Sequence, residues 1–126
     1  MILPAGTVSE TITNPQKEEL LLALVSFRGL IEIETEQGHG FILNENGNLA
    51  GAYFKKNNNG IFRGKTALLH LAIESRGSYE YPKTFKLRKY TDEEFSRSIR
   101  ISREEGLFIN GTSHAIIVPE DRKSVV

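Results

Sequence analysis

Residues 28–56 read RGLIEIETEQGHGFILNENGNLAGAYFKK, and this stretch determines the class of fold that we predict. Isoleucine and threonine alternate with glutamate over residues 31–36, which is the period of a strand with one buried and one solvated face. Asn46 and Gly47 supply the two positive φ angles that a type I′ hairpin turn requires. With a glycine-rich connection at residues 37–40, the stretch predicts a three-stranded antiparallel meander.

Helices are predicted on both sides of this stretch. Asn14, followed by a proline, is suited to cap a helix over residues 16–26. The apolar run at residues 20–25 covers more than half of the helix circumference, which predicts contacts on more than one side. A second helix is predicted over residues 67–73, with Gly77 placed to end it.

The next segment predicts a strand and a third helix. Residues 78–81 read as a fourth strand, which residues 85–90 extend beyond Pro82. Thr91 and Glu94 have the spacing of a capping box, so a third helix is expected to begin there. We predict that this helix ends near residue 105.

The end of the chain predicts a closing hairpin, in which residues 107–109 and 115–118 flank a turn at Asn110. The predicted fold class is therefore α+β, with an antiparallel sheet, the three-stranded meander plus additional strands, packed with two or three helices. We expect a single domain over residues 1–118 and a C-terminal tail over residues 119–126.

The composition excludes several classes of site and partner. The chain has 126 residues, no cysteine, and 16 basic against 16 acidic residues. Without cysteine it has no disulfide, thiolate zinc site or cysteine nucleophile, and we expect no cofactor. Because the net charge is zero, the protein has no overall positive electrostatic field that would attract a polyanion, so nucleic acid is not the expected partner. No apolar run is long enough to cross a bilayer, and a cytoplasmic protein without a membrane partner is expected. The oligomeric state does not follow from the sequence.

One short motif suggests nucleotide binding. Gly64, Lys65 and Thr66 lie between a predicted strand and a predicted helix and resemble part of a phosphate-binding loop. The motif is incomplete, because Asn59 stands five residues before Gly64, where the first glycine is expected. Nucleotide binding is therefore an alternative hypothesis, beside an ordinary helix N-terminus with a close backbone approach at Gly64.

The histidines and carboxylates give no catalytic or metal-binding residue. His39, His70 and His114 show none of the short spacings that set two imidazoles on one metal. His70 is predicted to be a partly buried packing residue of the second helix, and the other two to lie in turns. We therefore expect a non-enzymatic protein, unless residues distant in sequence build a site.

The solvated face of the sheet is the predicted interaction surface. Its first strand carries a row of carboxylates, and the segment from Lys83 to Tyr90 mixes basic and aromatic side chains. An exposed strand edge could also accept a partner strand by main-chain pairing. The basic and aromatic mixture equally suits single-stranded nucleic acid, which is the second alternative hypothesis. The candidate interaction residues are Glu32, Glu34, Glu36, Lys86 and Arg88.

The chain contains six short blocks of glycine and apolar residues whose order and spacing are informative. They are LLLALV (20–25), FRGLIEI (27–33), GFIL (40–43), GNLAGAY (47–53), GKTALL (64–69) and GSYE (77–80). Their order and spacing resemble the PATAN-type domain, found in many bacterial response regulators, and more closely a related archaeal family of unknown function, whose opening is similar to LPAG (3–6). The resemblance implies an α-β-β-β-α-β unit that mediates protein contacts in signalling and has no catalytic residues. The chain departs from the bacterial pattern because it has no receiver domain and continues past Tyr90. The expected partner is another protein or a further domain of the same polypeptide.

Overall fold

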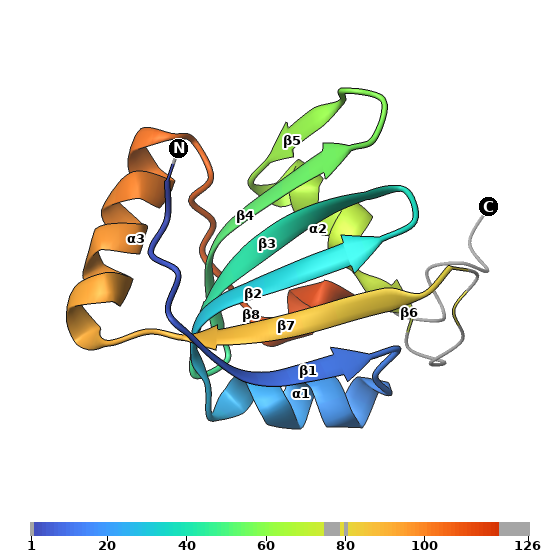
Figure 1. The fold of residues 1–126 in the computed structure, drawn as a ribbon, viewed down its shortest axis with the longest axis horizontal. Helices are drawn as coiled ribbons and strands as arrows, with labels where there is room; N and C mark the ends of the chain where they lie inside the picture. The colour runs from blue at the N-terminus through green and yellow to red at the C-terminus, as the bar shows by residue number, and fades with distance from the viewer. Residues whose placement is uncertain (1, 75–78, 80, 119–126) are drawn as a thin grey trace.

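A computed structural model describes residues 2–74, 79 and 81–118, in which three α-helices pack on an antiparallel sheet (Figure 1). The predicted α+β class is confirmed. In chain order the elements are β1 (Thr7–Thr13), α1 (Lys17–Val25), β2 (Arg28–Thr35), β3 (Gly38–Glu45), β4 (Asn48–Lys56), β5 (Ile61–Arg63), α2 (Lys65–Leu71), β6 (Ile73–Glu74), β7 (Lys83–Lys89), α3 (Asp92–Glu104), β8 (Gly111–Thr112), the 3-10 helix η1 (Ser113–Ile116) and β9 (Ile117–Val118).

The strands of the main sheet follow the order β1-β7-β2-β3-β4-β5, with β8 paired to β4. Every pairing in this sheet is antiparallel, and β2, β3 and β4 form the predicted meander. The turn between β3 and β4 has φ angles of 51° at Asn46 and 92° at Gly47, as a type I′ turn requires. β7 lies between β1 and β2, so the sheet joins segments that are far apart in the sequence.

The two faces of the sheet are covered differently. The larger hydrophobic cluster joins inward side chains such as Ile31 and Ile33 to Leu20 and Leu24 of α1 and to Leu71 of α2. All five of these side chains are fully buried. A second, smaller cluster lies on the opposite face and consists of Leu30, Leu43, Tyr90 and Phe95 of α3. The alternation predicted for β2 is therefore correct: its isoleucines face the main core.

The start of α1 differs from the prediction. Gln16 is the capping residue, and its side chain and that of Glu19 form a capping box. Asn14 instead has a φ of 50°, and its side-chain oxygen accepts a hydrogen bond from the Lys83 amide at 2.8 Å. The predicted cap at Asn14 is wrong, because this side chain closes the β1–β7 pairing across the sheet.

α1 contacts both β3 and η1, so the prediction of contacts on more than one side is correct in part, although the apolar run is not covered all round. Leu20 and Leu24 are fully buried, whereas Leu22 is 72% exposed and Val25 54% exposed. The helix therefore buries one face against the sheet and η1, and part of its apolar run faces outward.

The predicted glycine-rich connection at residues 37–40 is mostly strand. β3 begins at Gly38, and a Cβ atom at Gly38 or Gly40 would lie 2.2 or 2.1 Å from a carbonyl oxygen of β4. These two glycines therefore allow a close approach of two strands, and the reversal itself is confined to Glu36 and Gln37.

The region after α2 also departs from the prediction. α2 ends at Leu71, well before Gly77, which lies outside the described residues. Of the predicted strand at residues 78–81, Tyr79 and Tyr81 are not in a strand, and Ser78 and Glu80 lie outside the described residues. The strand that does form is β7, which begins after Pro82, because proline has no amide to donate to a ladder.

The third helix is confirmed, but the closing hairpin is wrong. α3 begins with the Thr91 capping box and ends at Glu104. Beyond it the carbonyl of Leu107 accepts a hydrogen bond from the Ala52 amide at 3.0 Å, and β8 pairs with β4. The chain then turns through η1, and β9 pairs in parallel with β6. The predicted tail at residues 119–126 lies outside the described residues.

Candidate functional site

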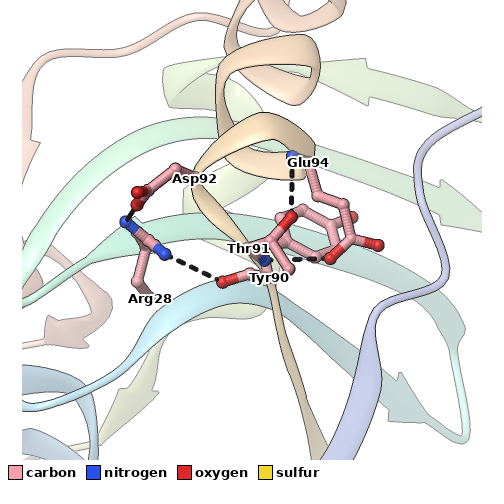
Figure 2. Close-up of polar contacts among 5 residues, drawn as sticks. All are labelled: Arg28, Tyr90, Thr91, Asp92 and Glu94. Atoms are coloured by element: carbon pink, nitrogen blue, oxygen red, sulfur yellow. Dashed lines mark hydrogen bonds and ion pairs between the residues drawn. The ribbon is translucent and has the colours of Figure 1, made fainter.

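α3 is fixed at one end of the sheet by the junction between β7 and the helix (Figure 2). The Arg28 guanidinium forms an ion pair with Asp92 and donates a hydrogen bond to the Tyr90 carbonyl at 3.1 Å. The Glu94 amide donates to the Thr91 hydroxyl at 3.2 Å, and the Thr91 amide donates to the Glu94 carboxylate at 2.9 Å. The first turn of α3 is thereby tied to β2.

Replacing Thr91 by alanine is expected to lower the free energy of unfolding by about 1 kcal/mol, because one amide of the first turn of α3 loses its acceptor. Urea unfolding followed by circular dichroism measures this change. Ser96→Ala, at an exposed position of the same helix, is the matched control and is expected to change stability by less than about 0.5 kcal/mol. Equal stability of the two variants would show that the cap contributes nothing.

The remainder of α3 packs closely on β4. The Ser102 hydroxyl donates to the Ala50 carbonyl at 3.0 Å, and a Cβ atom at Gly51 would lie 2.5 Å from the Ser102 oxygen. The N-terminal segment lies beside the helix, where the Tyr90 hydroxyl donates to the Pro4 carbonyl at 2.6 Å. In Figure 1, α3 lies at one end of the strands, away from the β2–β3 and β4–β5 turns.

Beyond α3 the same face of the sheet continues as two rows of side chains, which we call the open half. Strand residues that pair directly point to the same face, so the register assigns each row. The first row crosses β7, β2, β3, β4 and β5 as Lys86, Glu32, Phe41, Tyr53 and Arg63. The second row, nearer the β2–β3 turn, is Thr84, Glu34, His39, Lys55 and Ile61.

A stacked aromatic pair lies at the centre of the open half. The ring centroids of Phe41 and Tyr53 are 5.3 Å apart, with an angle of 18° between the ring planes. Both side chains are partly exposed, and Phe41 also packs against the second hydrophobic cluster. The cluster under α3 thus extends outward into an aromatic surface, a feature common in binding sites.

The charges of the open half are mixed, with basic groups in excess. Glu32 forms an ion pair with Arg88, which lies at the border with the α3-covered half and also donates to the Ala5 carbonyl at 3.3 Å. With that pair neutralised, three cationic side chains remain against one carboxylate, that of Glu34. The cationic side chains are Lys55, Arg63 and Lys86.

Four of the five predicted interaction residues come together at this surface. Glu32, Glu34 and Lys86 belong to its two rows, and Arg88 lies at its border. Glu36 is not among them, because it lies in the turn after the last residue of β2.

The aromatic pair and the cations of β4 and β5 were not predicted. The Asn46 turn alone would place Phe41 opposite Ala52, and a register shift between Leu43 and Asn44 brings Phe41 opposite Tyr53 instead. Arg63 has no signal of its own, because the three-residue strand β5 does not stand out in the sequence.

The motif Gly64, Lys65 and Thr66 begins α2 directly after β5. Gly64 has a φ of 66°, and the Thr66 hydroxyl donates to the Arg63 carbonyl at 2.9 Å. The predicted close approach at Gly64 is wrong, because a Cβ atom there would have no neighbour nearer than 3.8 Å. The preceding Ile61 and Phe62 are paired with β4 rather than arranged around an anion. Nucleotide binding stays a prediction without a geometric argument in its favour.

The three histidines lie in different environments. His39 lies in β3 on the open half, and His114 lies in η1, so neither is in the predicted turn. His70 of α2 packs against aromatic rings, as predicted for a partly buried residue. Within residues 2–74, 79 and 81–118, no group of three or more histidine, aspartate and glutamate side chains is placed to hold a metal ion.

Comparison of the chain with protein-family models, with curated proteins and with solved structures gave no match. The resemblance to the PATAN-type domain therefore stays a prediction. Among the described residues, no helix has the length and apolar character needed to span a membrane.

Proposed function

We propose that the chain is a protein-interaction module that binds an extended acidic segment of another protein, or of a further domain of the same polypeptide, on the open half of its sheet. The observation that carries the proposal is the row of side chains from Lys86 to Arg63, which crosses five strands with a stacked aromatic pair at its centre. Aromatic and arginine side chains are enriched among the residues that contribute most to the binding energy of protein interfaces.

Charge complementarity indicates the kind of segment. Lys86 lies on one side of the aromatic pair and Arg63 with Lys55 on the other, so a carboxylate-bearing segment laid across the pair would meet cations at both ends. An apolar side chain of the segment would contact Phe41 and Tyr53. A role in signalling, which the PATAN-type resemblance implies, is compatible with such a module and is part of the proposal.

The arrangement favours protein over single-stranded nucleic acid. The cations of the segment from Lys83 to Tyr90 are divided by the alternation of β7, with Lys86 and Arg88 on one face and Lys83 on the other. Arg88 is already paired with Glu32, and Glu34 stands beside the aromatic pair. A phosphate backbone would pass these carboxylates without a continuous track of cations.

A charge reversal on the open half tests the proposal. Peptides selected from a random 12-residue phage library on the native protein are expected to carry acidic and aromatic residues. Their dissociation constants, measured by fluorescence anisotropy, are expected to rise about tenfold with Lys86→Glu, because an attraction becomes a repulsion. Tyr53→Ser is expected to weaken binding comparably by removing one ring of the stacked pair.

Lys89→Glu is the matched control, because it makes the same charge change on the same strand but outside the open half. It is expected to leave peptide binding within about twofold of native. Selected peptides that bind the Lys86→Glu and native proteins equally would contradict the proposal. Binding of a 12-residue oligothymidylate that weakens steeply with salt, without peptide enrichment, would replace it with the nucleic-acid hypothesis.

A further inference from the structure

A cavity of about 200 Å³ lies at the end of the sheet opposite α3. Its walls come from the end of β2 and the turn after it, the end of α2, β6, and the start of β7. Thr35 and Lys83, which line it, share their side of the sheet with the main core, so the cavity is separate from the open half. Among the described residues that line it, only Ala72 and Ile73 lack a polar side chain.

Lys83 brings a partly buried positive charge to this cavity. Its ammonium group donates a hydrogen bond to the Ala72 carbonyl at 2.5 Å, which uses one of its three donors. Burial lowers the pKa of Lys83, and this effect outweighs the opposing attraction to Glu74. An additional anion beside the ammonium group would restore part of the solvation that the charge has lost.

His70 is held at the cavity in a fixed orientation. Its ring lies parallel to that of Phe54, with centroids 5.1 Å apart and an angle of 2°, and 4.2 Å from the centroid of Phe62. Aromatic contacts on the faces of an imidazole leave its nitrogen atoms, at the ring edge, for polar partners. The pKa of His70 is lowered first by burial and then by the positive charges of Lys56 and Lys83.

Tyr79 contributes a neutral side chain to the wall of the cavity. Its hydroxyl donates to the Pro15 carbonyl at 2.6 Å, and burial, with a smaller effect of Glu19, raises its pKa to about 12. The hydroxyl therefore stays protonated at neutral pH, and among the described residues the charges at the cavity are those of Lys83, Glu74 and the nearby Lys56.

We propose that this cavity binds the oxyanion group of a small molecule, a carboxylate or a phosphate, between the Lys83 ammonium group and the His70 imidazole. Both groups line the same cavity, and His70 lies close to the positive charges of Lys56 and Lys83. The cavity holds the volume of about six to seven water molecules, which suits a ligand of a few heavy atoms. The site does not depend on the proposed protein-binding function.

Nuclear magnetic resonance of the histidine rings tests the proposal without any substitution. Sodium acetate and inorganic phosphate are added in separate titrations at constant ionic strength. A bound oxyanion stabilises the imidazolium form, so the pKa of His70 is expected to rise and its ring resonances to shift with saturation. His39 and His114, which do not line the cavity, are internal controls and are expected to show no saturation. The anion that saturates His70 at the lower concentration identifies the class of ligand.

Lys83→Met tests the role of the ammonium group, and its expected effect is a loss of affinity of about tenfold. Lys89→Met, on the same strand but away from the cavity, is expected to leave the affinity unchanged. Linear shifts of all three histidines with both anions would overturn the proposal. So would saturation at His70 that persists in a folded Lys83→Met protein. If Lys83→Met does not fold, the titration of the native protein decides alone.

Discussion

Asn44→Asp is expected to lower the free energy of unfolding at pH 7 more than any other substitution proposed for this protein. The Asn44 side chain is fully buried, and its amide nitrogen donates to the carbonyls of Leu24 at 3.0 Å and Phe27 at 2.7 Å. These bonds satisfy the end of α1, which has no basic residue in its last turn. A carboxylate of the same shape would face two carbonyl oxygens without a donor, at a cost of about 4 kcal/mol or more. That is a large share of the roughly 5–15 kcal/mol that stabilises a typical domain.

The pH dependence of this variant is a second expected result. The buried aspartate at position 44 should have a folded-state pKa above the unfolded value of about 3.9, because burial disfavours its charged form. The free energy of unfolding of Asn44→Asp is therefore closest to that of the native protein below about pH 4, and it falls as the pH rises. Urea unfolding at pH 4 and pH 7 measures the difference. Asn48→Asp, at an exposed position, is the control and should show no such slope. A native-like stability of Asn44→Asp at pH 7 would contradict the role given to Asn44.

Gly29→Ala is expected to be comparably damaging. A Cβ atom at Gly29 would lie 2.0 Å from the Arg88 carbonyl oxygen and 3.0 Å from the ring of Phe27. The oxygen belongs to the backbone of β7, which is held on its other side by β1, so it has little room to move. We expect a loss of roughly 3 kcal/mol or more in the free energy of unfolding.

Gly111→Ala is the control for Gly29→Ala, because a Cβ atom there would meet nothing within 4 Å. Its free energy of unfolding is expected to change by less than about 0.5 kcal/mol. Denaturant midpoints of the two variants measure the contrast. Similar midpoints would mean that β2 and β7 separate at Gly29 at little cost.

The parts of the fold that depend on neighbours in sequence could be predicted. The meander follows from the alternation in β2 and from the Asn46 turn, and the start of α3 follows from the Thr91 capping box. The pairings of β1 with β7 and of β6 with β9 could not, because they join segments far apart in the chain. Asn14 shows how long-range pairing can override a local preference. Its sequence favours capping a helix, but its side chain instead accepts a hydrogen bond from the Lys83 amide.

The candidate site was predicted to a similar extent. Alternation placed Glu32 and Glu34 on one face, and the same rule applies to Lys86 and Arg88 of β7. β7 lies beside β2, and Arg88 therefore pairs with Glu32. This arrangement comes from the tertiary structure and has no signal in the sequence. The cavity at Lys83 had no sequence signal, because its walls come from elements that no short motif connects.

The position of β7 between β1 and β2 has a consequence for synthesis on the ribosome. As the nascent chain emerges, β2, β3 and β4 can pair with one another early, whereas β1 has no partner until nearly the whole sheet has been translated. During that interval its backbone amides and the side chain of Ile12, which the folded protein buries, stay unprotected. Such high contact order slows folding, and it makes the nascent β1 a segment for chaperones to shield.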